Sequence, residues 1–389
     1  MKLWIKDPMA MDTPEPKASS GLLVEDGLIT SVLDRPPEAF DEIFDASKLV
    51  VLPGLINGHH HFYQTLTRAV PAASDRALFP WLEALYPIWA NLSETDILLS
   101  SQIAASELLL SGCTTAVDHH YLYSEHLLNA TDLQVEAVKP LGLRSILCRG
   151  SMSLGQSQGG LPPDRVTQPE ATILKHSQLM LEAHHDPSPG AMHQIALAPC
   201  SPFSVSKTLM RETAALAEDF GAGLHTHLSE THDENTFCED LYGQRPLDYL
   251  EEVNWLRPNT WLAHGIHFEP TEIQRLGQAE VGITHCPSSN MILGSGICKT
   301  LELEAAGVHI GIGVDGSASN DSSNLILEAR QALLLQRLKY GSARVSIRHS
   351  LDWATREGAL AINRPELGSL EPGKAADLAL FKVDEIQHS

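Results

Sequence analysis

The stretch Val50-Val-Leu-Pro-Gly-Leu-Ile-Asn-Gly-His-His-His61 marks a change in the pattern of this chain. Before it, short apolar runs separated by turns predict β-strands, including a hairpin over residues 21–30 that turns at Asp26-Gly27. After it, short apolar strands alternate with longer segments of helical periodicity. Because such alternation produces parallel strands joined by right-handed crossovers, the chain from this stretch onward predicts an α/β fold.

Eight apolar strands can be counted from Val51 onward, and this number fits a closed barrel better than an open sheet. The seven strands after the first are expected at residues 114–117, 144–148, 194–198, 223–228, 260–264, 281–285 and 308–314. The sequence therefore predicts a TIM-type (β/α)8 barrel over residues 51–364.

The residues on either side of the barrel predict a second, smaller unit. Residues 1–50 read as short strands with turns, and residues 365–389 contain a turn followed by an apolar strand. That last strand has no partner near it in the sequence, so we expect it to pair with the N-terminal strands in a small β-sandwich domain. For the same reason we expect that the full protein continues beyond Ser389.

The charge balance and hydropathy of the 389 residues exclude several classes of protein. Acidic residues outnumber basic ones 49 to 27, a net charge of −22, which argues against nucleic acid as a partner because phosphate binding needs clustered Lys and Arg. No apolar run approaches the roughly 18 residues of a membrane span. The first 12 residues lack the continuous apolar stretch of a signal peptide, so we expect neither secretion nor membrane association.

Six cysteines are scattered along the chain without any CxxC pair. We therefore expect free thiols and a reducing, cytoplasmic location rather than a thiolate zinc finger. The 19 histidines, many of them in short clusters, direct the search toward metal chemistry. Assembly into a homo-oligomer stays open at this point.

In such a barrel the catalytic groups sit at the C-terminal ends of the strands. The first strand ends in His59-His60-His61, where alternation places His59 and His61 on one face, able to reach one cation together; a chance run of histidines is the alternative. The fifth strand ends at His227, a natural third ligand. Glu230 follows it and suits acid–base chemistry beside a metal, with a merely polar strand end as the alternative.

The sixth strand ends in His264, which is expected to point inward, with a structural histidine as the alternative. The eighth ends in Asp315, suited as a metal ligand or as a base for water, with a helix cap as the alternative. Three imidazoles and one carboxylate suit a borderline divalent ion, which would lower the pKa of its water from about 16 to near 7. The joint arrangement at four strand ends predicts metal-assisted hydrolysis.

This set of residues resembles the signature of the amidohydrolase superfamily over nearly the whole chain: His59-His60-His61, His227 with Glu230, His264 and Asp315. The resemblance implies a metal-dependent hydrolase barrel, similar to the single-metal aminohydrolases that deaminate nucleobases and related heterocycles. Two-metal members usually carry a carboxylated lysine at the end of the fourth strand. This chain reads Ala198-Pro-Cys-Ser-Pro202 there, with Lys207 too far along, so the resemblance implies one metal ion.

The resemblance also points to a class of substrate. The motif His59-x-His61-Phe-Tyr-Gln64 is similar to the purine-binding first loop of guanine deaminases, in which the glutamine contacts the base. Guanine deaminases place an arginine after the proline of the fourth strand, where this chain has Cys200. Together, five segments look like those of the 8-oxoguanine deaminases: residues 58–68, 78–82, 148–153, 198–203 and 285–290.

Four side chains are candidates to contact a flat purine base, which needs an apolar wall and a few fixed donors. Trp81 can cover a ring face, although packing within the helix expected at residues 80–89 is the alternative. Gln64 offers a donor and an acceptor to an amide edge. Arg149 can bond a carbonyl oxygen or form an ion pair, and Cys200 can contact the five-membered ring or fill the core as a small residue.

The resemblance assigns roles to the site. One divalent ion, expected to be zinc with iron or manganese as alternatives, would be held by His59, His61, His227 and Asp315. Asp315 would accept a proton from water, Glu230 would protonate the ring nitrogen, and His264 would orient the attacking oxygen. The implied reaction converts 8-oxoguanine and water to urate and ammonia.

Two other functions remain open on the sequence. The first is hydrolysis of a related substrate: guanine, isoguanine, cytosine or a hydroxylated s-triazine. The second belongs to another class, a metal-binding protein that keeps the fold without catalysis. The presence of a full acid–base set, Glu230, His264 and Asp315, argues against this second function because binding alone needs no proton transfer.

Overall fold

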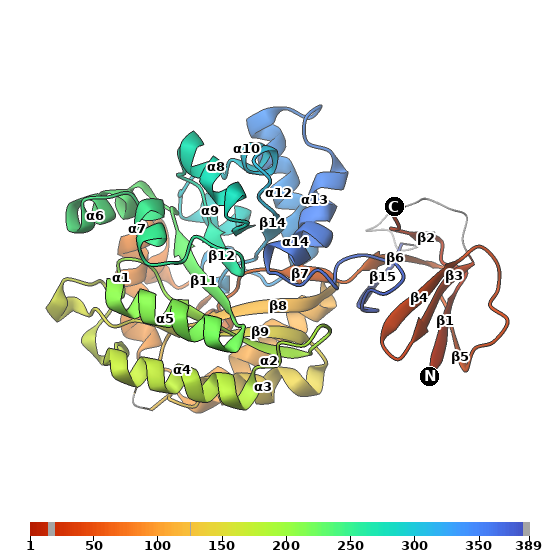
Figure 1. The fold of residues 1–389 in the computed structure, drawn as a ribbon, viewed down its shortest axis with the longest axis horizontal. Coiled ribbons are helices and arrows are strands. Elements are labelled where there is room, and N and C mark those ends of the chain that lie inside the picture. Colours follow the sequence, from red (N-terminus) through yellow and green to blue (C-terminus); the bar gives the residue numbers. More distant parts are fainter. Residues whose placement is uncertain (15–19, 125, 384–389) are drawn as a thin grey trace.

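The chain folds into a barrel surrounded by helices and a smaller unit of β-strands beside it, as the computed structural model shows (Figure 1). The structure describes residues 1–14, 20–124 and 126–383. Residues 384–389 of the predicted C-terminal return therefore lie outside the described residues.

Eight strands form the barrel: β7 Leu55–Asn57, β8 Cys113–His120, β9 Arg144–Ser151, β10 His193–Pro199, β11 Gly223–Leu228, β12 Thr260–His264, β13 Gly282–His285 and β14 Ile310–Ile312. Neighbouring strands are parallel, and the sheet closes in the order β10-β11-β12-β13-β14-β7-β8-β9. The predicted eight-stranded parallel barrel is confirmed. Its strands are almost entirely buried, because helices cover the outer face and side chains fill the interior.

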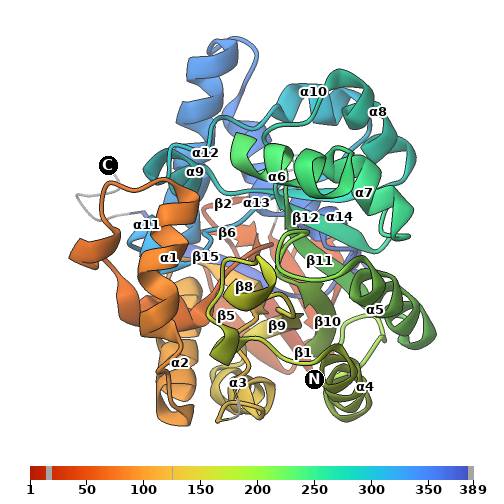
Figure 2. The ribbon, with the colours of Figure 1, turned by 90° about the vertical axis from the view of Figure 1, so that its left-hand side faces the viewer.

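The helices form a ring around these strands (Figure 2). They are α1 Leu78–Trp89, α2 Glu94–Leu110, α3 Ala130–Val138, α4 Glu170–His184, α5 Lys207–Phe220, α6 His232–Tyr242, α7 Pro246–Glu252, α8 Pro270–Gln278, α9 Pro287–Ile292, α10 Thr300–Ala305, α11 Ser317–Asn320, α12 Leu325–Tyr340, α13 Ile347–Ala354 and α14 Arg356–Ala361. None of the described helices is long and apolar enough to cross a membrane.

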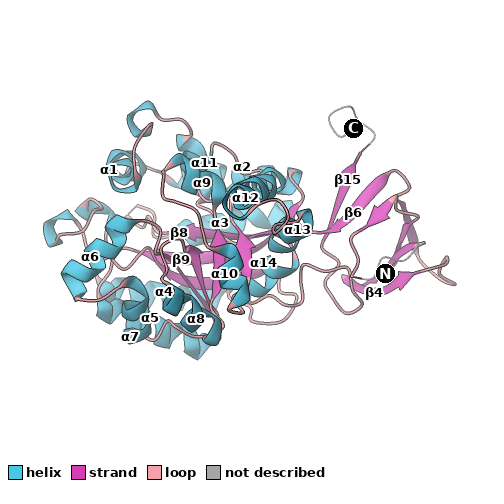
Figure 3. Ribbon diagram, turned by 90° about the horizontal axis from the view of Figure 1, so that it is seen from above, coloured by secondary structure: helices cyan, strands magenta, loops and turns pink. Residues whose placement is uncertain are grey.

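The smaller unit contains two sheets and lies to one side of the barrel (Figure 3). Its strands are β1 Lys2–Lys6, β2 Ala10–Met11, β3 Gly21–Glu25, β4 Leu28–Leu33, β5 Glu42–Asp45, β6 Leu49–Pro53 and β15 Leu378–Lys382. One sheet has the order β4-β3-β1-β5 and the other β15-β6-β2. The predicted hairpin is confirmed between β3 and β4, where Asp26 and Gly27 adopt φ angles of 50° and 82° that suit a tight hairpin turn. The last strand also pairs with an N-terminal strand, as expected, because β15 runs antiparallel to β6.

The first predicted barrel strand, counted from Val51, is two strands that belong to different sheets. Leu49–Pro53 forms β6 in the smaller unit, and only Leu55–Asn57 enters the barrel. The change occurs at Pro53-Gly54, since proline has no N–H to continue a ladder and the Gly54 N–H donates instead to Asp377 at 2.7 Å. A side chain at Gly54 would clash, because its Cβ would lie 2.0 Å from Oγ1 of Thr114. The predicted boundary at residue 50 thus falls within β6.

Candidate metal centre and active site

The structure brings six predicted site residues together at the C-terminal ends of four barrel strands. Five are buried and His227 is half-buried. They follow or end β7, β11, β12 and β14 and are His59, His61, His227, Glu230, His264 and Asp315.

The carboxylate of Asp315 lies at the centre of this group. Its Oδ1 is 3.3 Å from Nε2 of His59 and 3.4 Å from Nε2 of His61. Nε2 of His61 is in turn 3.2 Å from Nε2 of His227. Three imidazole nitrogens and a carboxylate oxygen from three strand ends therefore face one small volume.

Hydrogen bonds on the far side of each ring assign the ring protons. Nδ1 of His61 lies 2.6 Å from the carbonyl oxygen of His119, and Nδ1 of His227 lies 2.6 Å from that of Cys200. A carbonyl oxygen only accepts, so both Nδ1 atoms carry the proton. The Nε2 atoms of His61 and His227 consequently hold lone pairs when the rings are neutral.

His59 reaches the same state through a second histidine. Nδ1 of His225 faces the carbonyl oxygen of Trp261 at 2.9 Å and must donate to it. Nε2 of His225 is therefore the acceptor for Nδ1–H of His59, 2.8 Å away. Nε2 of His59, which has no hydrogen-bond partner among the described residues, is left with a lone pair pointing at Asp315.

Burial keeps these rings neutral, since it lowers the pKa of His59, His61 and His227 below the ordinary value. Lone pairs and a carboxylate oxygen that face one another repel unless a cation lies between them. The donor set fits a divalent metal that accepts nitrogen and oxygen ligands.

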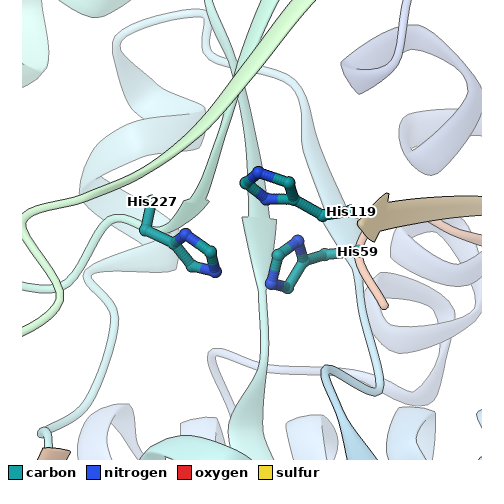
Figure 4. A group of neighbouring side chains, drawn as sticks. All are labelled: His59, His119 and His227. Atoms are coloured by element: carbon teal, nitrogen blue, oxygen red, sulfur yellow. The ribbon is translucent and has the colours of Figure 1, made fainter. Parts of the chain in front are cut away.

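His119, at the end of β8, is a residue that the sequence analysis missed. Two sets of ligand atoms lie within 4.8 Å of one another: His59, His119 and His227 (Figure 4), and His59, His264 and Asp315. Nε2 of His119 bonds the carbonyl oxygen of Ala198 at 2.8 Å, and its ring stacks on that of His227 at 4.8 Å between centroids. The signal in the sequence was the pair His119-His120 at the end of the second barrel strand.

Glu230 and His264 form a second pair beside the first group. Nδ1 of His264 donates to Oδ1 of Asn290 at 2.9 Å, which turns its Nε2 toward Oε2 of Glu230 at 3.5 Å and Oδ2 of Asp315 at 3.8 Å. Burial raises the pKa of Glu230. Burial would lower the pKa of His264, but the carboxylates of Glu230 and Asp315 outweigh it and raise that pKa. This pair can share and pass a proton.

Helix α9 supplies the residues that orient Asp315 and His264. The hydroxyl of Ser289 donates to Oδ2 of Asp315 at 2.6 Å, and the amide of Gly316 donates to Oδ1 at 2.7 Å. Asn290, the next residue in α9, holds His264. From the sequence, Ser289 and Asn290 belong to the segment 285–290 that resembles the 8-oxoguanine deaminases and are expected only to shape the seventh loop, because their contacts appear only when the loops after β12, β13 and β14 meet.

Three residues at these strand ends adopt left-handed backbone conformations. The φ angles are 53° for Ser229, 71° for His264 and 59° for Asp315. A residue other than glycine in this region costs of order 1–3 kcal/mol, and such residues cluster at functional sites. The backbone here is set to aim the side chains of Glu230, His264 and Asp315 into one volume.

A cavity opens directly onto the group. Its wall includes the predicted substrate contacts Gln64, Trp81 and Cys200, together with Tyr86 and Tyr121, which the sequence analysis did not single out. Oε1 of Gln64 is buried without a hydrogen-bond partner among the described residues, so it is free to bind a ligand. Burial raises the pKa of Cys200 to about 12, which keeps its thiol neutral.

Arg149 is absent from the described residues that line this cavity. Its guanidinium is buried and donates to Oε1 of Gln168 at 2.7 Å and to Nδ1 of His176 at 3.1 Å. It also lies over the ring of Tyr123, 4.0 Å from the centroid. The structure thus places Arg149 among protein partners and not beside the predicted substrate contacts.

Comparison with known proteins agrees with this arrangement. The chain is 55% identical over 392 aligned residues to an 8-oxoguanine deaminase of Pseudomonas aeruginosa, covering 100% of this chain and 87% of that protein. It is 37% identical to a hydroxydechloroatrazine ethylaminohydrolase of Pseudomonas sp. strain ADP, covering 89% and 73% of the two chains. A crystal structure of atrazine chlorohydrolase from Arthrobacter aurescens TC1 complexed with zinc superposes with a TM-score of 0.91 at 30% identity, covering 99% of this chain and 88% of that one.

A sequence model of the family described as "Amidohydrolase family" matches residues 50–388, which include the whole barrel and every residue of the group around Asp315. The closed barrel with its histidines at the strand ends, the relatives and the family match agree, and the chain belongs to the amidohydrolase family.

Proposed function

We propose that this protein deaminates an oxidised purine base, converting 8-oxoguanine and water to urate and ammonia. The observation that carries the proposal is the junction between a metal-binding group and a cavity whose lining is largely neutral. Glu230 and His264 stand at that junction, where the amine-bearing carbon of a bound base would lie. The 8-oxoguanine deaminase of Pseudomonas aeruginosa supports the choice of substrate.

We propose one divalent ion, zinc, with His59, His61, His227 and Asp315 as its ligands. The three lone pairs and the carboxylate fit such an ion, and a family member in the same fold was crystallised with zinc. When bound, the ion supplies Lewis acidity, which lowers the pKa of water at the site from about 16 to near 7.

The protein's own residues move the protons. Asp315, at the centre of the group, accepts a proton from the attacking water. Glu230 protonates the ring nitrogen next to the carbon under attack. His264, whose Nε2 lies near the carboxylates of Glu230 and Asp315, holds the water oxygen in line for attack. The carbon–nitrogen bond to the exocyclic amine then breaks as the added hydroxyl becomes a carbonyl. One proton of the water leaves with the amine as ammonia, and the other, taken up by Asp315, replaces the proton that Glu230 gave to the ring nitrogen.

The cavity suits a neutral bicyclic base. Outside the histidines and carboxylates of the centre, the described lining residues carry no charged side chain. Trp81 and Tyr121 offer ring surfaces, and the unpartnered Oε1 of Gln64 accepts from an N–H edge of the base. We propose that the neutral thiol of Cys200, which lines the cavity, contacts the five-membered ring, where the C8 oxygen lies.

The test is ammonia release from a panel of 8-oxoguanine, guanine, isoguanine, cytosine and a hydroxylated s-triazine, with the metal content of the same sample measured. We expect 8-oxoguanine to have the highest kcat/KM. Guanine turned over equally well would remove the argument from Cys200. A triazine turned over best would favour the activity suggested by the relative from Pseudomonas sp.. Bound zinc without any turnover would support the non-catalytic alternative.

The setting of this activity is also part of the proposal. The six cysteines are free and buried, as suits a reducing cytoplasm. The net charge of −22 argues against nucleic acid and against anionic membrane surfaces as partners. A small-molecule base is therefore the proposed partner, and gel filtration with light scattering will decide whether the enzyme is a homo-oligomer.

A further inference from the structure

The turn between β11 and α6 carries Glu230, and a second carboxylate is buried beneath it. Ser229 adopts the left-handed φ of 53°, and α6 begins two residues after Glu230. Glu234, in the first turn of α6, is 1% exposed. Thr231 caps the helix by accepting from the amide of Glu234 at 3.3 Å, which fixes where that side chain starts.

The carboxylate of Glu234 folds back onto the turn and binds two successive backbone amides. Its Oε1 accepts from the amide of Ser229 and its Oε2 from that of Glu230, both at 2.9 Å. No Lys or Arg of the described residues forms an ion pair with it, so backbone amides take the place of a cation. Burial is expensive for such a carboxyl and raises the pKa of Glu234 to about 7.

The other side of the same peptide group is fixed as well. The carbonyl oxygen of Ser229 accepts from the amides of Ile266 and His267, each at 2.9 Å. Those amides belong to the turn that directly follows His264. Through the carbonyl oxygen of Ser229, the turn that carries Glu230 is therefore tied to the turn that carries His264. Glu234 accepts from the two amides of the first turn, those of Ser229 and Glu230.

We infer that Glu234 is a positioning residue whose carboxylate holds the β11–α6 turn in its left-handed form and so sets Glu230 against His264. The inference rests on the proposed function for the role of Glu230. It adds a residue that is neither one of the proposed metal ligands nor one of the described residues lining the cavity, and that reaches the site through the backbone of Glu230. When one rigid carboxylate binds both backbone amides, the turn is held in a single conformation. Proton transfer depends on the position of Glu230 that this conformation sets.

The test begins with Glu234→Gln, which preserves shape but turns one acceptor oxygen into an NH2 group facing a backbone N–H. We expect kcat to fall about 10- to 100-fold, as for other residues that orient a site, with KM changed less than about threefold and zinc content unchanged. Glu272→Gln is the control for loss of a buried carboxylate that bonds a backbone amide, with the difference that Glu272 also pairs with Arg245 at 2.8 Å. Glu272 is also buried and accepts from a backbone amide, that of Glu269 at 2.6 Å, at the start of α8 away from the cavity. It should cost thermal stability but leave kcat intact.

A double-mutant cycle separates positioning from general destabilisation. If Glu234 acts through Glu230, then Glu234→Gln added to Glu230→Gln lowers kcat no further. An equal loss in both backgrounds would overturn the inference, as would a loss of zinc or a kcat that falls as much in the Glu272→Gln control.

A crystal structure of the Glu234→Gln variant gives an answer that does not depend on activity. We expect Oε2 of Glu230 to move away from its 3.5 Å distance to Nε2 of His264. A turn and a distance that stay unchanged would overturn the inference. If no heterocycle releases ammonia, the proposed function fails, while this structural result still decides the role of Glu234.

Discussion

The ends of β7 and β9 both present a buried, strongly polar side chain, yet they differ in what remains unbound. At the end of β9, the guanidinium of Arg149 is engaged by Gln168, His176 and the face of Tyr123. After β7, Nδ1 of His59 is hydrogen-bonded to His225, and its Nε2 has no partner among the described residues.

This difference teaches how to read a polar residue at a strand end. A buried polar group whose hydrogen bonds are complete stabilises the fold, because leaving its partners unpaired would cost free energy. A buried group that is oriented by a second residue but keeps one atom free is prepared for a ligand. The sequence shows the residue at the strand end, but only the fold shows which of these two cases applies.

Among the changes that test this comparison, removal of the metal should have the largest effect on activity. We expect a chelator to lower activity by at least about a thousandfold, because the proposed ion is what lowers the pKa of the attacking water. Zinc added back should restore the rate. Metal content by mass spectrometry, measured beside ammonia release, checks this. Activity that survives in metal-free protein would mean that the group around Asp315 serves another purpose.

Glu230→Gln should come next. We expect metal to stay bound and kcat to fall on the order of a hundredfold or more, because the amide cannot deliver a proton to the ring nitrogen. Steady-state kinetics on the zinc-loaded variant checks the prediction. Full activity would remove Glu230 from the mechanism.

His225→Phe tests whether orientation of His59 matters for the metal. The phenyl ring can keep the stack on Trp261, whose centroid is 4.8 Å from that of His225, but it offers no acceptor to Nδ1–H of His59. We expect zinc affinity to fall about 10- to 100-fold, measured by competition with a chromophoric chelator. His120→Phe is the control, since His120 is buried and, among the described residues, its hydrogen bond is to the carbonyl oxygen of Leu122 and not to His59. Equal losses of zinc affinity in both variants would refute a role for the His225–His59 hydrogen bond in metal binding.

Gly316→Ala probes the free atom of Gln64 without altering Gln64 itself. Gly316 has a φ of −73°, which alanine tolerates, but the added Cβ would lie 1.8 Å from Oε1 of Gln64 and force that amide to move. We expect KM to rise about tenfold, equivalent to ~1.4 kcal/mol of binding. The same substitution in a Gln64→Ala background should add little. A further tenfold rise there would show that the effect comes from elsewhere.

Arg149→Met should have the smallest effect on activity. We expect kcat/KM to stay within about threefold, while the free energy of unfolding drops by about 1–3 kcal/mol because Gln168 loses its donor. Urea denaturation and steady-state kinetics on one preparation check both halves. A large rise in KM at full stability would return Arg149 to the substrate site.

Much of the fold follows from the sequence because strand–helix alternation is a local signal. The eight barrel strands appear where apolar runs alternate with helical periodicity, and the hairpin at Asp26-Gly27 needs only two residues that accept positive φ. The first strand was placed too early because Val51 and Leu52 are as apolar as the barrel strand that follows. Only the pairing with β15, more than 300 residues later, assigns them to the other sheet.

The same distinction between local signals and long-range contacts applies to the residues of the site. His59, His227, His264 and Asp315 could be chosen because each stands at the end of an apolar run. The orienting residues could not, since Ser289, Asn290, His225 and Glu234 gain their roles from contacts between loops or strands. For the same reason the sequence could not show that Tyr121 lines the cavity.

The pairing of β6 with β15 has a consequence for the order of events during synthesis on the ribosome. The barrel can close once β14 has emerged, because its last partner β7 was made long before. The sheet β15-β6-β2 is completed only by residues 378–382, so β6, which can pair with β2 on one side, has its other edge unpaired during most of translation. Nascent chains arrested shortly after β14 should therefore expose β6 to chaperones or to protease, while the metal-binding half of the molecule is already assembled.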